Sequence, residues 1–388
     1  MLRYLTAGES HGKVLTAILE GMVADLSLSS EEINKDLARR QGGYGRGERM
    51  KIEKDKAEIL SGVRNGKTIG SPISIIIRNL DWENWEDVMT VESGDKVGAS
   101  VTNLRPGHAD LAGVLKYGQK DIRNILERAS ARETAARVAV GAVAKRFLSE
   151  FNIIVGSHVV RIGGISCQGS GVSKRENVEA LLNSAEKSQV RCTDEKASKQ
   201  MMAEIDKAAS DGDSLGGVFE VIVLNCPAGL GSHVHWDRKL KTKLAAALMS
   251  IQAVKGVEIG MGFEAAALRG SQVHDEIFYE NGKFTHKTNN AGGLEGGITN
   301  GEPITLRAAV KPIATLRKPL KSVDIASKKP TDAHVERSDT CAVPAAGVIG
   351  EAVASFEVAN ALLEKFGGDS LKETLGNFKS YQKDMLNM

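Results

Sequence analysis

Residues 127–145 read ERASARETAARVAVGAVAK and lie within a longer stretch in which apolar residues recur every three or four positions. From Asp121 to Phe151 this spacing is typical of one face of an α-helix. Arg132 and Glu133 interrupt the apolar stripe, and several alanines keep the neighbouring side chains small. The stretch therefore predicts one long buried helix that is polar at its middle.

Other helices and strands are indicated on both sides of this stretch. Ser29 and Glu32 predict a capping box before a short helix that ends at Gly42. Helices grouped between sets of strands favour an α+β fold over a doubly wound sheet. The further helices are predicted at 237–254 and 344–366, the strands at 72–79, 152–162, 217–225 and 303–310, and a hairpin at Asn281-Gly282.

The composition is that of an ordinary globular protein, and no linker divides it, so one domain is expected over 1–388. The chain has 51 Lys and Arg against 49 Asp and Glu, so an anion site must be local. Four cysteines without C-x-x-C spacing indicate neither a disulfide framework nor a zinc site, and they favour a cytoplasmic location. No apolar run indicates a membrane span. The polar, lysine-rich residues 167–212 predict a peripheral insertion.

The segment RRQGGYGRGERMK, residues 39–51, combines five positive side chains with four glycines. Guanidinium groups bind phosphate and carboxylate through paired hydrogen bonds, and glycines let the backbone approach a ligand closely. The segment predicts a local anion site, and a solvated basic loop is the alternative. Neither this segment nor GDSLGG at 212–217 has the spacing of a P-loop or a Rossmann fingerprint, so ATP and dinucleotide folds are not supported.

Two short motifs place a histidine in a turn. GESHG at 8–12 contains Ser10 and His11, and RPGHAD at 105–110 surrounds His108 with an arginine and an aspartate. Imidazole titrates near neutral pH, so the two motifs suggest a pair of groups that transfer protons. An incidental surface histidine is the alternative for each motif. Because no G-x-S-x-G elbow is present, Ser10 is not expected to be a covalent nucleophile.

Charged residues within the central stretch allow two interpretations. Arg128 and Arg132 are four positions apart, so on one helix they would share a face. Arginines on a buried helix need an anion. A bound anion and an internal salt bridge with Glu127 or Glu133 agree equally well with the spacing.

Two weaker patterns lie in the second half of the chain. VERSDT at 335–340 brings an arginine, a serine and an aspartate just before a predicted helix, where helix capping is the alternative. His233 and His235 alternate as two metal ligands on a strand would, but only Asp237 offers a third ligand. No metal site is therefore predicted.

Seven ordered motifs from Arg3 to about Phe366 together resemble the chorismate synthase family. They are GESHG, RQGGYGRG, RPGHAD, ERASARET, SIQAVKGVEIG, NNAGGLEGGITNG and ERSDTCAVPAA. The resemblance implies a single-domain β-α-β sandwich, with central helices between antiparallel sheets, that assembles as a homotetramer. It also implies a carbon–oxygen lyase that converts 5-enolpyruvylshikimate 3-phosphate to chorismate and phosphate by 1,4-anti elimination. This is the last step of the shikimate pathway of aromatic amino-acid biosynthesis, and it requires reduced FMN without net redox change.

The resemblance also implies roles for individual residues. His11 would protonate the departing phosphate, and His108 would lie beside N1 and O2 of the flavin. Ser10 and Asp339 would act together near flavin N5. The arginines implied to bind the phosphate and the two carboxylates are Arg40, Arg46, Arg49, Arg105, Arg132 and Arg337. The implied flavin contacts are Ser130, Ala131, Arg132, Gln252, Ala253, Gly296, Lys311, Pro312, Ile313, Ala314, Thr315 and Arg337.

The sequence departs from the family pattern at a few positions. Ala314 stands where proline is usual, and Glu48 lies inside the arginine-rich segment. Some members of the family reduce FMN themselves with NADPH, whereas others rely on a separate flavin reductase, and the compact length favours the second group.

Two other classes of function remain open from the residues alone. A flavin oxidoreductase would use the same pocket for net hydride transfer, but no NAD(P)H-binding fold is indicated. A binding module for RNA would use the arginines at 39–49, but 4% aromatic residues provide few stacking platforms. Neither nucleic acid nor a membrane is an expected partner.

Overall fold

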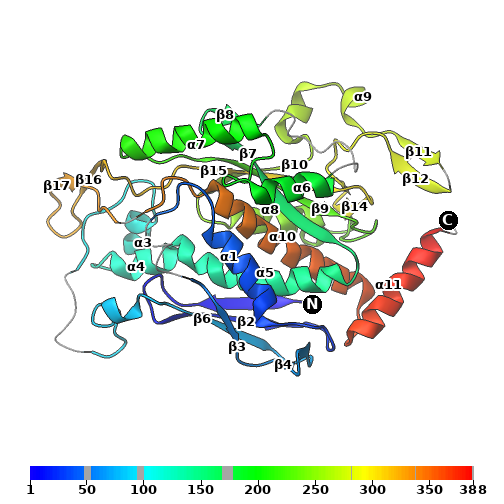
Figure 1. Ribbon diagram of the computed structural model, residues 1–388, viewed down its shortest axis with the longest axis horizontal. Helices are drawn as coiled ribbons and strands as arrows, with labels where there is room; N and C mark the ends of the chain where they lie inside the picture. The colour runs from blue at the N-terminus through cyan, green and yellow to red at the C-terminus, as the bar shows by residue number, and fades with distance from the viewer. Residues whose placement is uncertain (48–53, 94–99, 168–177, 281, 337, 387–388) are drawn as a thin grey trace.

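The structure, a computed structural model, describes residues 1–47, 54–93, 100–167, 178–280, 282–336 and 338–386. Two antiparallel sheets lie on either side of a layer of helices, as Figure 1 shows. This arrangement confirms the expected α+β sandwich with helices at its centre.

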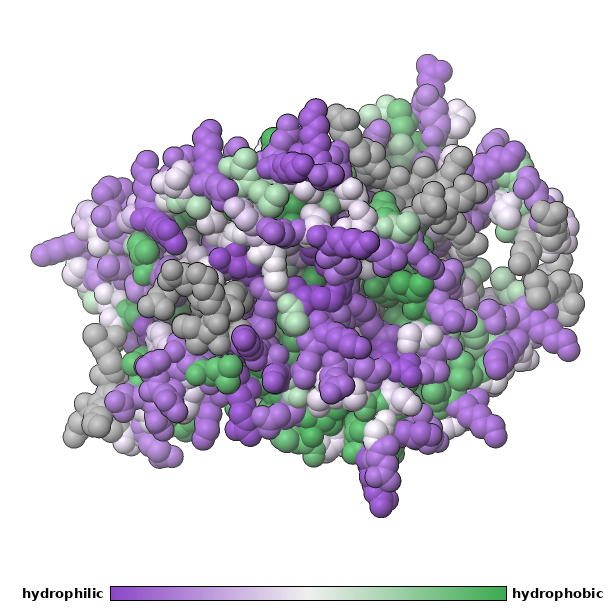
Figure 2. Space-filling view, viewed as in Figure 1, coloured by the Kyte–Doolittle hydropathy of each residue, from purple (hydrophilic) through white to green (hydrophobic). Residues whose placement is uncertain are grey.

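The four-stranded sheet has the order β1-β2-β6-β3. Ile73, Ile75 and Ile77 of β6 are buried, and the residues between them are partly exposed, so one face of the sheet packs on the helices. The opposite face carries Leu5 and Ile18, which are direct partners in the ladder and are 76% and 46% exposed. Figure 2 shows hydrophobic side chains along the lower edge of the view, where this sheet lies. Its strands are β1 (Arg3–Ala7), β2 (Val14–Glu20), β6 (Ile73–Arg78) and β3 (Ala57–Ile59).

The five-stranded sheet has the order β10-β15-β9-β7-β8. Its central strand β9 is buried from Phe219 onward, as expected for a strand covered on both faces. The predicted strands at 72–79, 152–162, 217–225 and 303–310 are confirmed as β6, β7, β9 and β15 within one or two residues at each end. The strands of this sheet are β10 (Val254–Ile259), β15 (Ile304–Val310), β9 (Gly217–Leu224), β7 (Ile154–Ile162) and β8 (Ile165–Ser166).

The helix layer consists of α1 (Ser30–Gln41), α5 (Thr134–Ser149) and α10 (Val343–Phe366). Helix α5 packs on the first sheet, and α10 packs on the second sheet and on α5. Helix α10 is long and apolar enough to cross a bilayer, but 94% of its most apolar window is buried inside the protein, as in a core helix. The capping box at Ser29 and the helix predicted at 344–366 are both confirmed.

The single helix predicted from Asp121 to Phe151 is wrong. The chain instead forms α4 (Arg123–Ala129), a short 3-10 helix η2 (Ala131–Glu133) and then α5. Ser130 between them is extended, with φ −63° and ψ 143°, and its hydroxyl accepts a hydrogen bond from the Arg132 N–H. The break rotates Arg128 away from Arg132, so the two arginines do not share a helix face. Arg128 donates to the backbone oxygens of Thr6 and Gly8.

The predicted insertion at 167–212 contains two packed helices, α6 (Val178–Lys187) and α7 (Glu195–Ser210). The apolar residues of α7 recur at helical spacing, and Met201 and Ile205 enter the main core. The helix predicted at 237–254 is shorter in the structure. It is α8 (Leu240–Met249), and strand β10 already begins at Val254. The hairpin is confirmed by the pairing of β11 with β12, although Asn281 lies outside the described residues.

The remaining elements are short, apart from the helices α3, α8 and α11. They are β4 (Val63–Arg64), β5 (Lys67–Thr68), η1 (Trp82–Asn84), α3 (Asp110–Tyr117), η3 (Trp236–Arg238), α8 (Leu240–Met249), η4 (Gly262–Ala267), α9 (Gly270–Val273), β11 (Ile277–Glu280), β12 (Lys283–His286), β13 (Leu294–Glu295), β14 (Ile298–Thr299), β16 (Lys321–Val323), β17 (Pro330–Asp332) and α11 (Leu371–Leu386).

Gly141 of α5 lies directly against Ala352 of α10, and this contact leads to a first prediction. A Cβ at Gly141 would lie 2.3 Å from the Ala352 Cβ and 2.5 Å from its Cα. Gly141→Ala is therefore expected to lower the free energy of unfolding by about 1–3 kcal/mol through overpacking, measured by urea unfolding at fixed protein concentration. Gly376→Ala is the matched control, since Gly376 is also helical and has nothing within 4 Å of its Cβ position. Equal stability of both variants and the unsubstituted protein would contradict the close helix contact.

Candidate active site

A cavity of about 920 Å³ lies where the helix layer meets the loops that follow β1 and β15. The start of α10 and the η2 segment before α5 form part of its wall, through Ala345, Ala346, Ala131 and Thr134. The amino ends of helices carry partial positive charge, so two such ends at one cavity favour an anionic ligand.

Residues far apart in the sequence meet at this cavity. The four predicted catalytic residues, Ser10, His11, His108 and Asp339, all line it. Of the predicted substrate arginines, those that line the cavity are Arg40, Arg46, Arg105 and Arg132. Arg49 and Arg337 lie outside the described residues.

The paired arginines Arg40 and Arg132 share a carboxylate that sequence reasoning missed. Arg132 donates to Asp55 at 2.5 Å, and Arg40 lies 3.6 Å from the other Asp55 oxygen. Arg40 also donates to the Thr134 hydroxyl at 3.0 Å. The Asp55 side chain is 1% exposed, so these contacts hold both guanidinium groups in place at the cavity wall. Of the two interpretations of Arg132, the structure shows a salt bridge, but to Asp55 rather than to an acid on its own helix.

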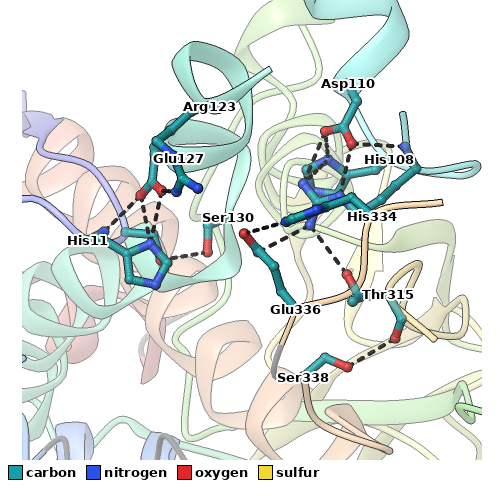
Figure 3. A network of polar contacts seen from close by, with 12 residues as sticks. His11, His108, Asp110, Arg123, Glu127, Ser130, Thr315, His334, Glu336 and Ser338 are labelled. Atoms are coloured by element: carbon teal, nitrogen blue, oxygen red, sulfur yellow. Dashed lines mark hydrogen bonds and ion pairs between the residues drawn. The ribbon is translucent and has the colours of Figure 1, made fainter. Parts of the chain in front are cut away.

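The RPGHAD motif forms a triad in which Arg105 and Asp110 are buried and His108 is partly buried. Arg105 donates to Asp110 at 2.9 Å, and His108 Nδ1 lies 2.5 Å from the same carboxylate. Burial raises the pKa of Asp110, but the hydrogen bonds from His108 and Arg105 hold it well below its usual range. The carboxylate is thus anionic and orients both His108 and Arg105 (Figure 3).

A second carboxylate near Arg105 was also missed. Glu336 lies 3.5 Å from the Arg105 guanidinium and 3.2 Å from His334 Nε2. Burial raises the Glu336 pKa, but the hydrogen bond with His334 and the charge of Arg105 lower it to about 2. Asp339, three residues on, accepts from Arg46 and from the Gly47 N–H, each at 2.6 Å. The segment 336–339 therefore supplies anions to two cavity arginines.

Most of the predicted flavin contacts also line the cavity: Ser130, Ala131, Arg132, Gln252, Ala253, Lys311, Ile313, Ala314 and Thr315. Pro312 and Gly296 are outside this lining, and Gly296 lies between β13 and β14. Lys311 donates its N–H to the Ala253 carbonyl and its Nζ to the Gly107 carbonyl at 2.8 Å, which joins three segments of the wall. Among the departures from the family pattern, Ala314 lines the cavity, and Glu48 lies outside the described residues.

His235 pairs with Asp237 at 2.6 Å on an exposed surface. Within the described part of the chain, no group of three His, Cys, Asp or Glu is arranged to hold a metal ion.

Comparisons with known proteins identify the family of this chain. A family model described as chorismate synthase matches residues 2–363. Chorismate synthase from Geobacillus sp. (strain WCH70) is 56% identical over 390 residues, covering 99% of this chain and 100% of the relative. The enzyme of that name from Desulforamulus reducens is 59% identical, covering 99% of both chains. A crystal structure titled as that of chorismate synthase superposes with a TM-score of 0.81 at 48% identity, covering 100% of this chain and 99% of the other. The chain therefore belongs to the chorismate synthase family, whose members are carbon–oxygen lyases that act on phosphates.

Proposed function

We propose that this protein eliminates phosphate from 5-enolpyruvylshikimate 3-phosphate to form chorismate, with reduced FMN as cofactor, as the last step of the shikimate pathway. The observation that carries the proposal is the meeting of four predicted catalytic residues and four arginines in one cavity. The reaction breaks one C–O and one C–H bond in a 1,4-anti sense and releases phosphate.

The arginines account for the binding of a substrate with a phosphate and two carboxylates. Each of Arg40, Arg46, Arg105 and Arg132 is already oriented by a carboxylate of the protein. Guanidinium groups bind phosphate and carboxylate oxygens through charge-assisted hydrogen bonds, and four of them at one wall favour a ligand that carries several negative charges. Fixed donors of this kind stabilise developing negative charge without reorganising.

Four residues on the cavity wall are proposed to take part in proton transfer. His11 is proposed to donate a proton to the departing phosphate, which neutralises the charge that develops on its oxygen. Asp339 and Ser10 are proposed to guide the proton that the substrate loses, and His108 to act beside the cofactor.

The cavity fits a flavin as well as a small anionic substrate. Its volume of about 920 Å³ is at the upper end of the usual range of about 300–1,000 Å³ for ligand sites. Alanines at 131, 253 and 314 provide flat apolar wall, and Ser130, Gln252, Lys311 and Thr315 provide polar groups around it. These residues would hold reduced FMN, which when bound supplies an electron to the substrate and recovers it without net redox change.

The protein is further proposed to work in the cytoplasm as a homotetramer. Large exposed hydrophobic side chains support the burial of surface in an assembly. They include Leu5 and Ile18 on one sheet, and Trp236 and Phe263, which are 67% and 80% exposed. We propose that a separate flavin reductase reduces the FMN, and that this chain does not itself reduce FMN with NADPH.

The testing experiment is anaerobic. Purified protein, dithionite-reduced FMN and 5-enolpyruvylshikimate 3-phosphate are mixed, and chorismate absorbance and released phosphate are followed together. Equal amounts of both products, with no net consumption of reduced flavin, support the proposal. Net flavin oxidation for each turnover would indicate an oxidoreductase, and absence of both products from folded protein would refute the proposed reaction.

Asp339→Asn tests the role proposed for Asp339 in guiding the proton that the substrate loses. The amide cannot act as a base. Its NH₂ is a hydrogen-bond donor, so it would face either the Arg46 guanidinium or the Gly47 N–H, both of which now donate to the carboxylate. Turnover is expected to fall about 100-fold or more, while FMN binding, measured by fluorescence quenching, stays largely intact. Turnover at the unsubstituted rate would exclude a proton-transfer role for Asp339.

A further inference from the structure

Glu127 is a buried carboxylate that contacts His11 through both its oxygens. Its side chain is 2% exposed, and His11 Nδ1 lies 2.9 and 3.0 Å from the two oxygens. The backbone N–H of His11 donates to the same carboxylate at 2.8 Å. Figure 3 shows Glu127 reaching from α4 to the His11 ring, across the cavity from His108 and Glu336. The carboxylate therefore fixes both the main chain and the ring of His11.

The chemistry of this contact determines which ring nitrogen carries a proton. An ionised carboxylate accepts hydrogen bonds and cannot donate them, so Nδ1 of His11 must carry the proton that it shares with Glu127. Nε2, on the other side of the ring, is then the atom that can exchange a proton with a ligand in the cavity. The same negative charge stabilises the imidazolium, which is the form that a general acid requires.

A tryptophan holds the face of the same ring. The His11 and Trp85 rings are stacked, with centroids 3.7 Å apart and 23° between planes. The Trp85 N–H donates to Asp81 at 3.1 Å, and the Arg123 guanidinium lies 5.2 Å from the indole centroid. Arg123 also donates to Glu127 at 3.0 Å. Glu127 thus fixes the ring in its plane, and Trp85 prevents it from tilting.

The backbone of Glu127 anchors the neighbouring catalytic residue. The Ser10 N–H donates to the Glu127 carbonyl at 3.0 Å. This bond does not involve the side chain, so a substitution at Glu127 can separate the positioning of His11 from that of Ser10.

We infer that Glu127 is a positioning residue that holds His11 with Nδ1 protonated, so that Nε2 is the ring atom that transfers a proton to the departing phosphate, and that Trp85 supports the same orientation. The inference rests on the proposed role of His11 as the general acid. Glu127 differs from a purely structural carboxylate because its charge must affect the protonation of the acid, and that effect can be measured.

Within the part of the chain that the structure describes, the charged groups near His11 include Glu127 and Arg123 from α4 and Glu336 from the segment before Asp339. Glu127→Gln removes one negative charge from this set and keeps the side-chain shape. Its kcat is expected to fall about 10- to 100-fold, with the KM for 5-enolpyruvylshikimate 3-phosphate and the FMN affinity changed less than about threefold. The alkaline limb of the kcat–pH profile is expected to move to lower pH, because the imidazolium loses its anionic partner.

Glu220→Gln is a matched control. Glu220 also pairs with a buried histidine, His158, at 2.9 Å, and neither residue lines the cavity. This variant is expected to lose stability but to keep the pH profile of the unsubstituted protein. A shift of the profile in Glu220→Gln as large as in Glu127→Gln would overturn the inference, because loss of a buried pair would then explain both.

Glu127→Asp is the second variant at this position, and it is sufficient to test the positioning role if Glu127→Gln does not fold. The shorter side chain keeps the charge but lengthens the contact with Nδ1, so kcat is expected to fall while the pH limb stays near its original position. An unshifted limb in Glu127→Gln, or full turnover in either Glu127 variant, would overturn the positioning role. Failure of the unsubstituted protein to form chorismate would instead refute the proposed function, so the two failures are distinguishable.

Discussion

Replacing His11 with alanine is expected to lower turnover of 5-enolpyruvylshikimate 3-phosphate about 100-fold or more, because a positioned general acid contributes about 10²–10⁴ to rate. The His11 ring lies at the cavity wall, 9% exposed as a residue, where a ligand can reach it. The four cavity arginines remain in the variant, so substrate affinity and FMN affinity are expected to change little. Single-turnover measurement with reduced FMN separates this loss in chemistry from any change in binding.

His235→Ala is the control for this substitution. His235 is likewise hydrogen-bonded to a carboxylate, Asp237, but it lies on an exposed surface away from the cavity lining. It is expected to turn over at the original rate. Equal activity of the two variants would show that His11 does not donate the proton to phosphate.

Replacing Glu351 with glutamine is expected to cost about 3–5 kcal/mol of unfolding free energy, because it breaks a buried ion network. Glu351 is fully buried in α10 and accepts hydrogen bonds from Arg39 of α1, Lys145 of α5 and Arg191, at 2.8 to 3.0 Å. An amide cannot neutralise the three cations around it, and its NH₂ would face one of them. Urea unfolding at fixed protein concentration measures the loss.

The pH dependence of the same variant provides an independent check. Burial raises the pKa of Glu351, but Lys145 and Arg39 hold it far below its usual range. A lowered folded-state pKa stabilises the fold above the unfolded pKa of about 4.3, and the stabilisation is lost as pH falls below it. The stability difference between the original protein and Glu351→Gln is therefore expected to be full at pH 7 and to shrink below about pH 4.

Glu58→Gln is the surface control, because the Glu58–Arg78 pair is exposed and screened by water. Its unfolding midpoint is expected to stay close to that of the unsubstituted protein. If Glu351→Gln lost no more unfolding free energy than Glu58→Gln, the large stabilisation proposed for the buried network would be contradicted.

The elements that could be predicted from the sequence are those whose signals are local. The α1 capping box, the glycine that ends α10 and the alternation of β6 each involve residues within a few positions of one another. The break at Ser130 was missed, because the apolar spacing continues through it and its extended backbone depends on contacts made elsewhere. Its hydroxyl bonds the Arg132 N–H and the Ser10 hydroxyl, 120 positions away.

The candidate site was predictable only as separate motifs, through their resemblance to a family. Asp110 is evident beside Arg105 and His108 in one motif, but Asp55 was missed as the partner of Arg132, and Glu127 was considered a partner for an arginine of its own helix rather than for His11. Asp55 lies 77 positions from Arg132, and Glu127 lies 116 positions from His11. No local spacing relates such pairs, since a lone aspartate or glutamate in a helix or loop is usually solvated.

The sequence by itself determined the classes of element, the apolar faces that form the core, and the residue types available for anion binding and proton transfer. Only the tertiary structure decided which acid pairs with which base, where the helix at Ser130 breaks, and which way His11 and the arginines face. The physical reason is range: propensity, capping and periodicity act over one or two turns of chain, whereas a buried charge is stabilised by whichever opposite charge the fold brings within about 3–4 Å.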